Sequence, residues 1–461
     1  MSWQERNDKP SSFGGNKAEE NMLSTLVLRS GAWYGDRVLE LRIPQNWDVT
    51  VLWPQTPPPL SEKETAEILQ NPVGQASVQN LCKGKSRPLV IVDDLNRPTP
   101  AERVVSILLE YFQGAGIPLR EVTILMATGS HGKPAPDAMY KKVGKRAAES
   151  CRLLVHDCFR TVRFGKTSFG TPVYVNRAVL NSDFVLGIGG VYPNHTAGFG
   201  GGTKLALGVL GIQSIFDLHF RHPSVGWGSV KANQSFREDL NEIADMIGLR
   251  TTISLQIDAD REIVRIDSGD PQKYFPEALD FARRTFNTLP CRDADVVISN
   301  TYPNDLSLTF AQMKGFAPFL NCKLSASKIA IASCDEGLGL HNIFPFVNVP
   351  RFHRERQLFR RFQAYGPVKF SKFVLGNVQS KVFSSLRVNP RSPESTIKHQ
   401  IWLYRPGKHD FELPSVLPGI MQAKQWPDVL QAIKKEQEPK DRPKVIVYPC
   451  AFLQVNQPSV A

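Results

Sequence analysis

The chain has 461 residues, of which 41% are hydrophobic and 22% are charged, so a wholly disordered or collagen-like chain is excluded. Its net charge is +12, from 56 Lys and Arg against 44 Asp and Glu. This excess favours a nucleic acid, an anionic membrane surface or a small anionic ligand as partner, or it is surface charge without a partner.

Nothing in the sequence is typical of export or membrane insertion. It contains no run of 18 apolar residues, and the polar N-terminal stretch has no apolar segment like that of a signal peptide. The seven cysteines are scattered and form no CxxC pair, which disfavours a zinc ribbon or thioredoxin-like site and fits reduced thiols. We therefore expect a cytoplasmic protein without membrane contact.

The first half of the chain alternates strand and helix patterns. Residues 1–21 are polar and predict a disordered tail. Alternating apolar and polar residues then predict a β-hairpin and a short strand, and Ser61 with Glu64 forms a capping-box pattern at the start of a helix. The predicted elements are hairpin strands at 23–31 and 36–44, strands at 49–54, 87–94, 121–132 and 183–193, and helices at 61–73 and 100–116. This order predicts βαβ units.

The second half continues the same pattern. Strands are predicted at 293–300, 327–334 and 444–450, and residues 351–363 are strongly basic with a helical period. We expect an α/β fold with two α/β domains, divided as a tail at 1–21, an N-terminal domain at 22–282 and a C-terminal domain at 283–461.

Unusual polar residues follow three predicted strands of the N-terminal domain. They occur in VDDLNRPTP with Asp94 and Arg97, in ATGSHGKP with His131, and in the segment that contains PNHTAGFGGGTK. Because ligands of open α/β sheets bind beyond the carboxyl ends of the strands, these segments predict a binding site.

The third segment contains a glycine run that resembles a phosphate-binding loop. Lys204 is followed by Leu205, so the run is not a Walker A motif, and Thr203 occupies the last glycine position of a GxGxxG motif. A lysine behind such a loop can bind phosphate or act as a covalent amine. The alternative is a glycine-rich turn that packs a helix on the sheet.

In this order, DDLNRPTP, ATGSHGKP and PNHTAGFGGGTK resemble the nickel-pincer lactate racemase family. Three further segments also resemble that family, namely GAWYGDRVLELRIP near the start and YPNDLSLTFAQMKGF and IAIASCDEGLG in the second half. The resemblance implies two α/β domains with an active-site cleft between them, the N-terminal domain carrying the cofactor loop. It also implies a nickel pincer nucleotide, nickel pyridinium-3,5-bisthiocarboxylic acid mononucleotide, and proteins that synthesise it.

The resemblance assigns roles to individual residues. It implies that Lys204 tethers the cofactor and that His219 completes the nickel coordination. It places the acid and base functions on His131 and His195, with Asp94 beside them. The remaining implied contacts, to cofactor or substrate, belong to Arg97, Asn194, Gly200, Gly201, Gly202 and Lys314.

The implied reaction is racemisation or epimerisation of a 2-hydroxy acid by proton-coupled hydride transfer through a 2-keto acid. The chain departs from the family pattern where PHxxAGF becomes PNHTAGF, so Asn194 occupies the slot of the second histidine. Either His195 reaches the site by a local shift, or one base is missing. In the second case the chain is a repurposed homologue that binds a nucleotide or anionic ligand without racemisation. Nucleic-acid binding is disfavoured because no recognised module is present.

Overall fold

The computed structural model describes residues 23–229, 234–343, 371, 400–407, 412–413, 417, 419–438 and 440–456. The predicted disordered tail and the basic helix at 351–363 lie outside these residues. In the described part of the chain, no helix is long and apolar enough to cross a membrane.

The chain forms two compact units, each built from separate segments. The glycine-loop unit comprises residues 56–284 and 340–397, and the hairpin unit comprises residues 1–55, 285–339 and 398–461, as far as they are described. This division differs from the predicted one, because residues 23–55 belong with the C-terminal part of the chain. Local periodicity predicted the strands of this segment but not the sheet to which they belong.

The glycine-loop unit is built on a six-stranded sheet in the order β13-β12-β9-β4-β5-β6. All neighbours are parallel except β12 and β13, which are antiparallel. The strands of this sheet are β4 (Pro88–Asp93), β5 (Thr123–Ala127), β6 (Arg152–Val155), β9 (Phe184–Gly190), β12 (Thr251–Ile257) and β13 (Ile263–Gly269). Two small antiparallel pairs join β7 (Val162–Lys166) to β8 (Pro172–Val175) and β10 (Pro193–Asn194) to β11 (Gly198–Phe199).

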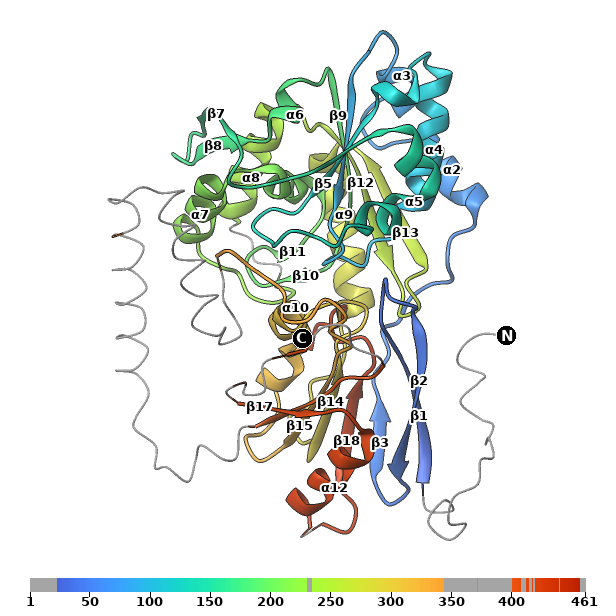
Figure 1. The fold of residues 1–461 in the computed structure, drawn as a ribbon, viewed down its shortest axis with the longest axis vertical. Coiled ribbons are helices and arrows are strands. Elements are labelled where there is room, and N and C mark those ends of the chain that lie inside the picture. The colour runs from blue at the N-terminus through green and yellow to red at the C-terminus, as the bar shows by residue number, and fades with distance from the viewer. Residues whose placement is uncertain are drawn as a thin grey trace. The chain divides into compact units, whose positions relative to one another are not determined.

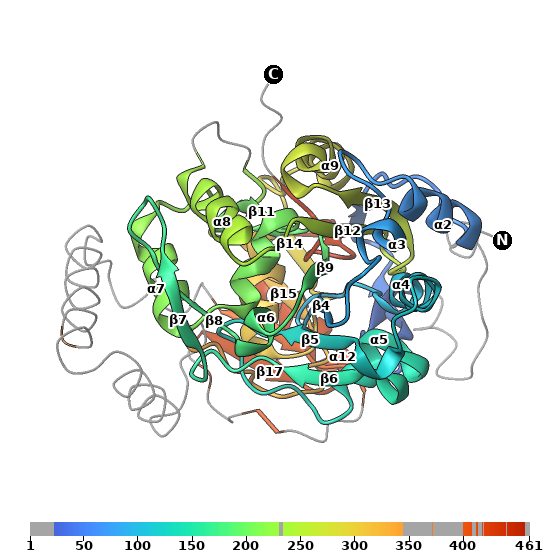
Figure 2. The ribbon, with the colours of Figure 1, turned by 90° about the horizontal axis from the view of Figure 1, so that it is seen from above.

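Helices lie on both sides of this sheet. Both views place α2 to α5 on one side and α6 to α8 on the other (Figures 1 and 2). The helices of this unit are α2 (Glu62–Gln70), α3 (Val78–Leu81), α4 (Glu102–Gly114), α5 (Ala138–Ser150), α6 (Arg177–Leu180), α7 (Ile212–Arg221), α8 (Ser235–Met246) and α9 (Pro271–Phe286), with the 3-10 helices η2 (Leu119–Glu121) and η3 (Gly202–Val209). The predicted capping box of α2 is confirmed, since Ser61 Oγ accepts the Glu64 N–H and Glu64 accepts the Ser61 N–H.

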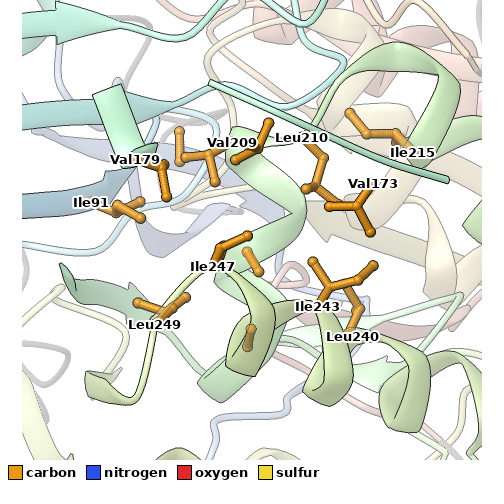
Figure 3. Packing of buried hydrophobic residues seen from close by; sticks show 14 of the residues in the cluster. Ile91, Val173, Val179, Val209, Leu210, Ile215, Leu240, Ile243, Ile247 and Leu249 are labelled. Atoms are coloured by element: carbon orange, nitrogen blue, oxygen red, sulfur yellow. The ribbon is translucent and has the colours of Figure 1, made fainter. Parts of the chain in front are cut away.

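One core of this unit joins the sheet to the segment after the glycine run. Ile91 of β4 is fully buried with Val209 of η3, Ile215 of α7 and Ile243 of α8 (Figure 3). Burying such side chains contributes about 1.5–3 kcal/mol each. The glycine run is therefore fixed between β9 and a tightly packed 3-10 helix.

The hairpin unit has its own six-stranded sheet in the order β17-β16-β15-β14-β18-β3, and all its neighbours are parallel. The predicted hairpin is confirmed as β1 (Leu23–Ser30) paired with β2 (Arg37–Pro44). The strands of the sheet are β3 (Asp48–Val51), β14 (Val296–Asn300), β15 (Ser327–Ile331), β16 (Ile401–Tyr404), β17 (Ile420–Ala423) and β18 (Lys444–Tyr448). The helical segments are α10 (Leu308–Phe310), the π-helix η4 (Ala311–Gly315), the 3-10 helix η5 (Ala317–Leu320) and α12 (Trp426–Glu436).

The N-terminal strands belong to this unit for two reasons. β3 pairs with β18 from the far end of the chain. The apolar face of the hairpin, with Leu28 and Leu41, shares a core with Ile298 of β14 and Trp426 of α12.

Candidate active site

The three predicted polar segments meet in the glycine-loop unit. They follow β4, β5 and β9, and these strands are neighbours in the order β9-β4-β5. Because parallel strands end at the same edge of a sheet, the residues after them converge. The predicted gathering of polar side chains at this edge is therefore present in the structure.

An aspartate–histidine pair lies at the centre of this edge. The Nδ1 atom of His131 is 2.6 Å from Oδ2 of Asp94, which also accepts a hydrogen bond of 2.9 Å from Asn96. Burial opposes ionisation of Asp94, but His131 and Arg97 outweigh it and lower the pKa of the Asp94 carboxyl to about 2. An ionised Asp94 accepts the proton on Nδ1, so neutral His131 presents its lone pair at Nε2, as a general base requires.

The loop that carries Asp94 and Arg97 is held by a buried lysine that the sequence analysis did not select. Lys142 of α5 is fully buried, and its ammonium donates to Asp93 Oδ1 (2.8 Å), the Arg97 carbonyl (2.9 Å) and the Thr99 carbonyl (3.1 Å). Asp93 also accepts the Thr99 hydroxyl at 2.6 Å. All three ammonium protons are thus used to fix this loop against α5.

Lys204 provides a reactive amine. It is partly buried in η3, and no hydrogen bond or ion pair of its ammonium occurs among the described residues. Burial, with the positive charges of Arg97 and Arg237, lowers the pKa of Lys204 to about 7. A large fraction of this lysine is therefore a neutral, nucleophilic amine near neutral pH.

His219 of α7 lies near this amine. Its Nδ1 donates to the Ile215 carbonyl at 2.7 Å, so the neutral ring presents its lone pair at Nε2, a common metal-ligand atom. Burial lowers the pKa of His219 to about 4; the hydrogen bond to Ile215 opposes this shift and the charge of Lys204 adds to it. The ring is therefore neutral, which metal coordination requires.

The glycine run is shaped by its own internal hydrogen bonds. Gly200 donates its N–H to the Tyr192 carbonyl at 2.7 Å, and Gly202 donates to Ser254 Oγ at 3.2 Å. Both N–H groups therefore have acceptors inside the protein, and the contacts with the cofactor implied for Gly200, Gly201 and Gly202 stay predictions. Gly201 has φ +86°, and a Cβ there would lie 2.6 Å from Val191, so close packing requires glycine.

Arg237 of α8, which the sequence analysis did not select, supports this run from behind. Its guanidinium donates to the carbonyls of Phe199 (2.7 Å) and Gly201 (3.2 Å) and lies 3.9 Å from the Phe275 ring centroid. It is buried, and no motif marked it because it lies in an ordinary amphipathic helix.

The histidine motif of the third segment forms a tight turn. Asn194 Oδ1 accepts the N–H groups of Thr196 (2.9 Å) and Ala197 (3.0 Å), so its side chain stabilises the turn. His195 is partly buried, and its ring centroid lies 4.9 Å from that of Trp227.

Lys314 lies in the hairpin unit, on η4, and is described separately from the other predicted residues. It is 4% exposed, and its Nζ atom is 4.7 Å from the centroid of the Phe452 ring. Its predicted place in a site shared with the glycine-loop unit stays a prediction.

An unselected histidine, His341, lies against His131. Their ring centroids are 5.3 Å apart, and both belong to the glycine-loop unit. The sequence offered only one indication of it, since His341 follows a predicted strand and the turn DEGLG.

Together these features define an α/β protein with an aspartate–histidine pair and a nucleophilic amine at the carboxyl ends of adjacent parallel strands. Residues 34–228, which carry every predicted site residue except Lys314, match the family model of the lactate racemase N-terminal domain.

The chain is similar to curated and structurally determined proteins of this kind. It is 27% identical over 292 residues to the lactate racemases of Lactiplantibacillus plantarum and Thermoanaerobacterium thermosaccharolyticum, covering 61% of this chain and 68% of each relative. Its fold is similar to the lactate racemase apoprotein of the second organism, with a TM-score of 0.65 at 22% identity over 94% of this chain and 99% of that one. A Thermotoga maritima protein has a TM-score of 0.54 at 18% identity, covering 87% and 99%.

These findings confirm the recognition of the lactate racemase family and the α/β fold class with two α/β domains. Both curated relatives are racemases, so the predicted enzyme class, an isomerase, is confirmed at the level of the family.

Proposed function

We propose that the protein is a nickel-dependent racemase or epimerase of a 2-hydroxy acid. The observation that carries the proposal is Lys204, an amine with a pKa of about 7 and no partner in the described part of the chain, within electrostatic reach of a neutral histidine. Such a lysine is suited to a covalent tether, whereas a structural lysine is normally charged and paired.

The residues present fit a nickel pincer nucleotide bound through Lys204. His219 would donate Nε2 to the metal, and no group of three or more His, Cys, Asp or Glu side chains that could hold a metal ion occurs in the described ranges. The fit is therefore to a metal whose other ligands come from the tethered group. When bound, this group supplies the acceptor for the C2 hydride of the substrate.

The chain itself moves the hydroxyl proton. His131 takes this proton at Nε2, and Asp94 holds the ring by its Nδ1–H and stabilises the imidazolium that forms. Arg97 and Lys314 are proposed to bind the substrate carboxylate, Arg97 through a planar fork and Lys314 as a point charge.

His195 is proposed as the second base, and Asn194 as a residue that shapes the loop around the cofactor. The cofactor-synthesis proteins are proposed partners, and a cytoplasmic location is proposed with them. The second candidate is a homologue that binds a nucleotide or anionic ligand without racemisation. It is favoured by Asn194, whose amide is committed to the turn at the position of the usual histidine.

The test is co-expression with cofactor-synthesis proteins, followed by intact-protein mass spectrometry, nickel analysis and a chirality-resolved panel of 2-hydroxy acids. We expect a covalent adduct and nickel in the wild type, neither in Lys204→Arg, and both in the control Lys63→Arg, whose side chain is 86% exposed. No adduct and no nickel in the wild type would refute the proposal.

The same panel separates the two candidates. If His195 is the second base, His195→Ala loses interconversion and keeps the adduct and nickel. Full activity of this variant removes His195 from the mechanism. A loaded wild type that converts no hydroxy acid supports the non-racemising homologue.

A further inference from the structure

The segment that carries His341 is attached to the turn that carries His131. Gly132 donates its N–H to the Leu340 carbonyl at 2.9 Å, and Asn342 donates to the Ser130 carbonyl through its N–H at 2.8 Å and its side chain at 3.0 Å. His131 and His341 form a backbone bridge between these hydrogen bonds. The two imidazoles therefore have backbones fixed side by side.

Close packing between Gly132 and Leu340 also holds the His341 segment against the turn of His131. A Cβ on Gly132 would lie 2.9 Å from Cβ of Leu340, so only glycine permits this approach without a shift. His341 is 7% exposed and the side chain of His131 is 12% exposed. The rings, with planes inclined at 56°, thus share a largely buried space.

The two rings are held in opposite tautomers. Asp94 accepts from Nδ1 of His131, which leaves the lone pair of that ring at Nε2. Nδ1 of His341 accepts the N–H of Ile343 at 3.2 Å, so neutral His341 carries its proton at Nε2. One ring is therefore a proton acceptor and its neighbour an N–H donor.

We propose that His341 is the positioning partner of His131, and that the two imidazoles form a coupled pair that holds one excess proton. The role of His341 in catalysis rests on the proposed function, because it acts through His131. The pair takes up the hydroxyl proton on His131, and His341 stays neutral and keeps the His131 ring oriented against Asp94. In the reverse reaction on this face, His131 returns the proton to the keto oxygen as the hydride returns to C2, so the step balances without a further reagent.

The charges around the pair favour the first proton and oppose the second. Ionised Asp94 contacts His131 and stabilises its imidazolium. The positive charges of Arg97, on the Asp94 loop, and of the exposed Lys133, on the turn of His131, oppose a second positive charge. Two imidazoliums with ring centroids 5.3 Å apart repel each other in this partly desolvated space. The second protonation is therefore displaced to lower pH by on the order of one unit or more.

The first experiment is a pH titration of histidine side chains by ¹⁵N-resolved NMR on the apoprotein, which needs no cofactor. We expect His131 to titrate first and His341 to titrate at least about one unit lower. In His131→Gln, the midpoint of His341 should rise by about one unit. In the control His156→Gln, where the lost imidazole is buried and hydrogen-bonds to the Leu210 carbonyl and the Asn176 side chain, the His341 midpoint should not move.

Equal midpoints for both rings in the wild type, or an unchanged His341 midpoint in His131→Gln, would overturn the proposal. The wild-type titration alone decides the question if a variant fails to fold. Because the readout is on the apoprotein, it can fail while the racemase assay succeeds, and the reverse.

The second experiment uses the loaded enzyme. His341→Gln should lower kcat at least tenfold with little change in KM and should displace the acidic limb of the pH–rate profile. His341→Phe, which keeps a ring but no nitrogen, should lose as much activity as His341→Gln. Wild-type kcat and pH profile in both variants would refute a role through His131.

Discussion

The lowered pKa of Lys204 makes a quantitative prediction about its reactivity. With a pKa of about 7, about nine tenths of Lys204 is neutral at pH 8, against roughly 0.4% of a lysine of pKa about 10.4. Nucleophilicity falls with basicity, and a Brønsted slope of about 0.4–0.5, the value for thiols, removes roughly 30-fold of that roughly 200-fold advantage. The net gain in acylation rate at pH 8 is roughly five- to tenfold.

The sharper measure is the pH at which the acylation rate is half-maximal. Competitive labelling of the apoprotein with an amine-acylating reagent, followed by peptide mass spectrometry, should place this midpoint near pH 7 for Lys204. Lys63, whose side chain is 86% exposed, is the internal reference. Arg97→Gln removes one of the two charges that depress the pKa, so the midpoint should move upward.

A midpoint above about pH 9 for Lys204 in the wild type would refute the reasoning, because burial would then not be destabilising the ammonium. A midpoint near 7 that does not move in Arg97→Gln would limit the cause to burial and Arg237.

Three further predictions concern stability. Lys142→Met leaves Asp93 and two carbonyls without their buried donor, so it should lower the free energy of unfolding in urea by about 3–5 kcal/mol. The control Lys141→Met, at a partly buried lysine, should change it by at most about 1 kcal/mol, and equal losses in the two variants would contradict this. Gly208→Ala places a Cβ 2.6 Å from Ala127 and should lose about 1–3 kcal/mol in thermal or urea unfolding, more than Gly189→Ala, whose nearest neighbour is at 3.4 Å. The folded-state pKa of Asp94 is lowered to about 2, so ionised Asp94 contributes about 2 kcal/mol to the free energy of unfolding above pH 4, and this contribution is lost as the pH falls toward 2. The difference in unfolding free energy between the wild type and Asp94→Asn should therefore shrink from pH 6 to pH 3, and a constant difference would refute this.

The fold could be predicted from the sequence where a signal is local. The alternation at 23–44 predicted the hairpin, and the Ser61–Glu64 pair predicted the start of α2. Sheet membership could not be predicted, because β3 pairs with β18, a strand close to 400 residues away in the chain, and neither strand carries information about its neighbour.

The site shows the same limit. Asp94, His131 and Lys204 lie in motifs with unusual composition, so the sequence could select them. Lys142 and His341 could not be selected, because each acts through a long-range contact: Lys142 lies in a helix with other basic residues, and His341 depends on a backbone bridge to the turn of His131. Burial, which distinguishes Lys142 from its neighbours, is a property of the fold.

The structure also bears on how His195 could serve as a base. A one-residue slip of the motif would bring its ring to the usual position, but Pro193 pairs with Phe199 and Asn194 pairs with Gly198, so both ends of the turn are held in register. Asn194 Oδ1 closes the turn through two N–H groups, and a slip would break these hydrogen bonds at about 0.5–1.5 kcal/mol each. The displaced histidine is therefore part of a fixed turn, and any base function of His195 must be exerted from residue 195 itself.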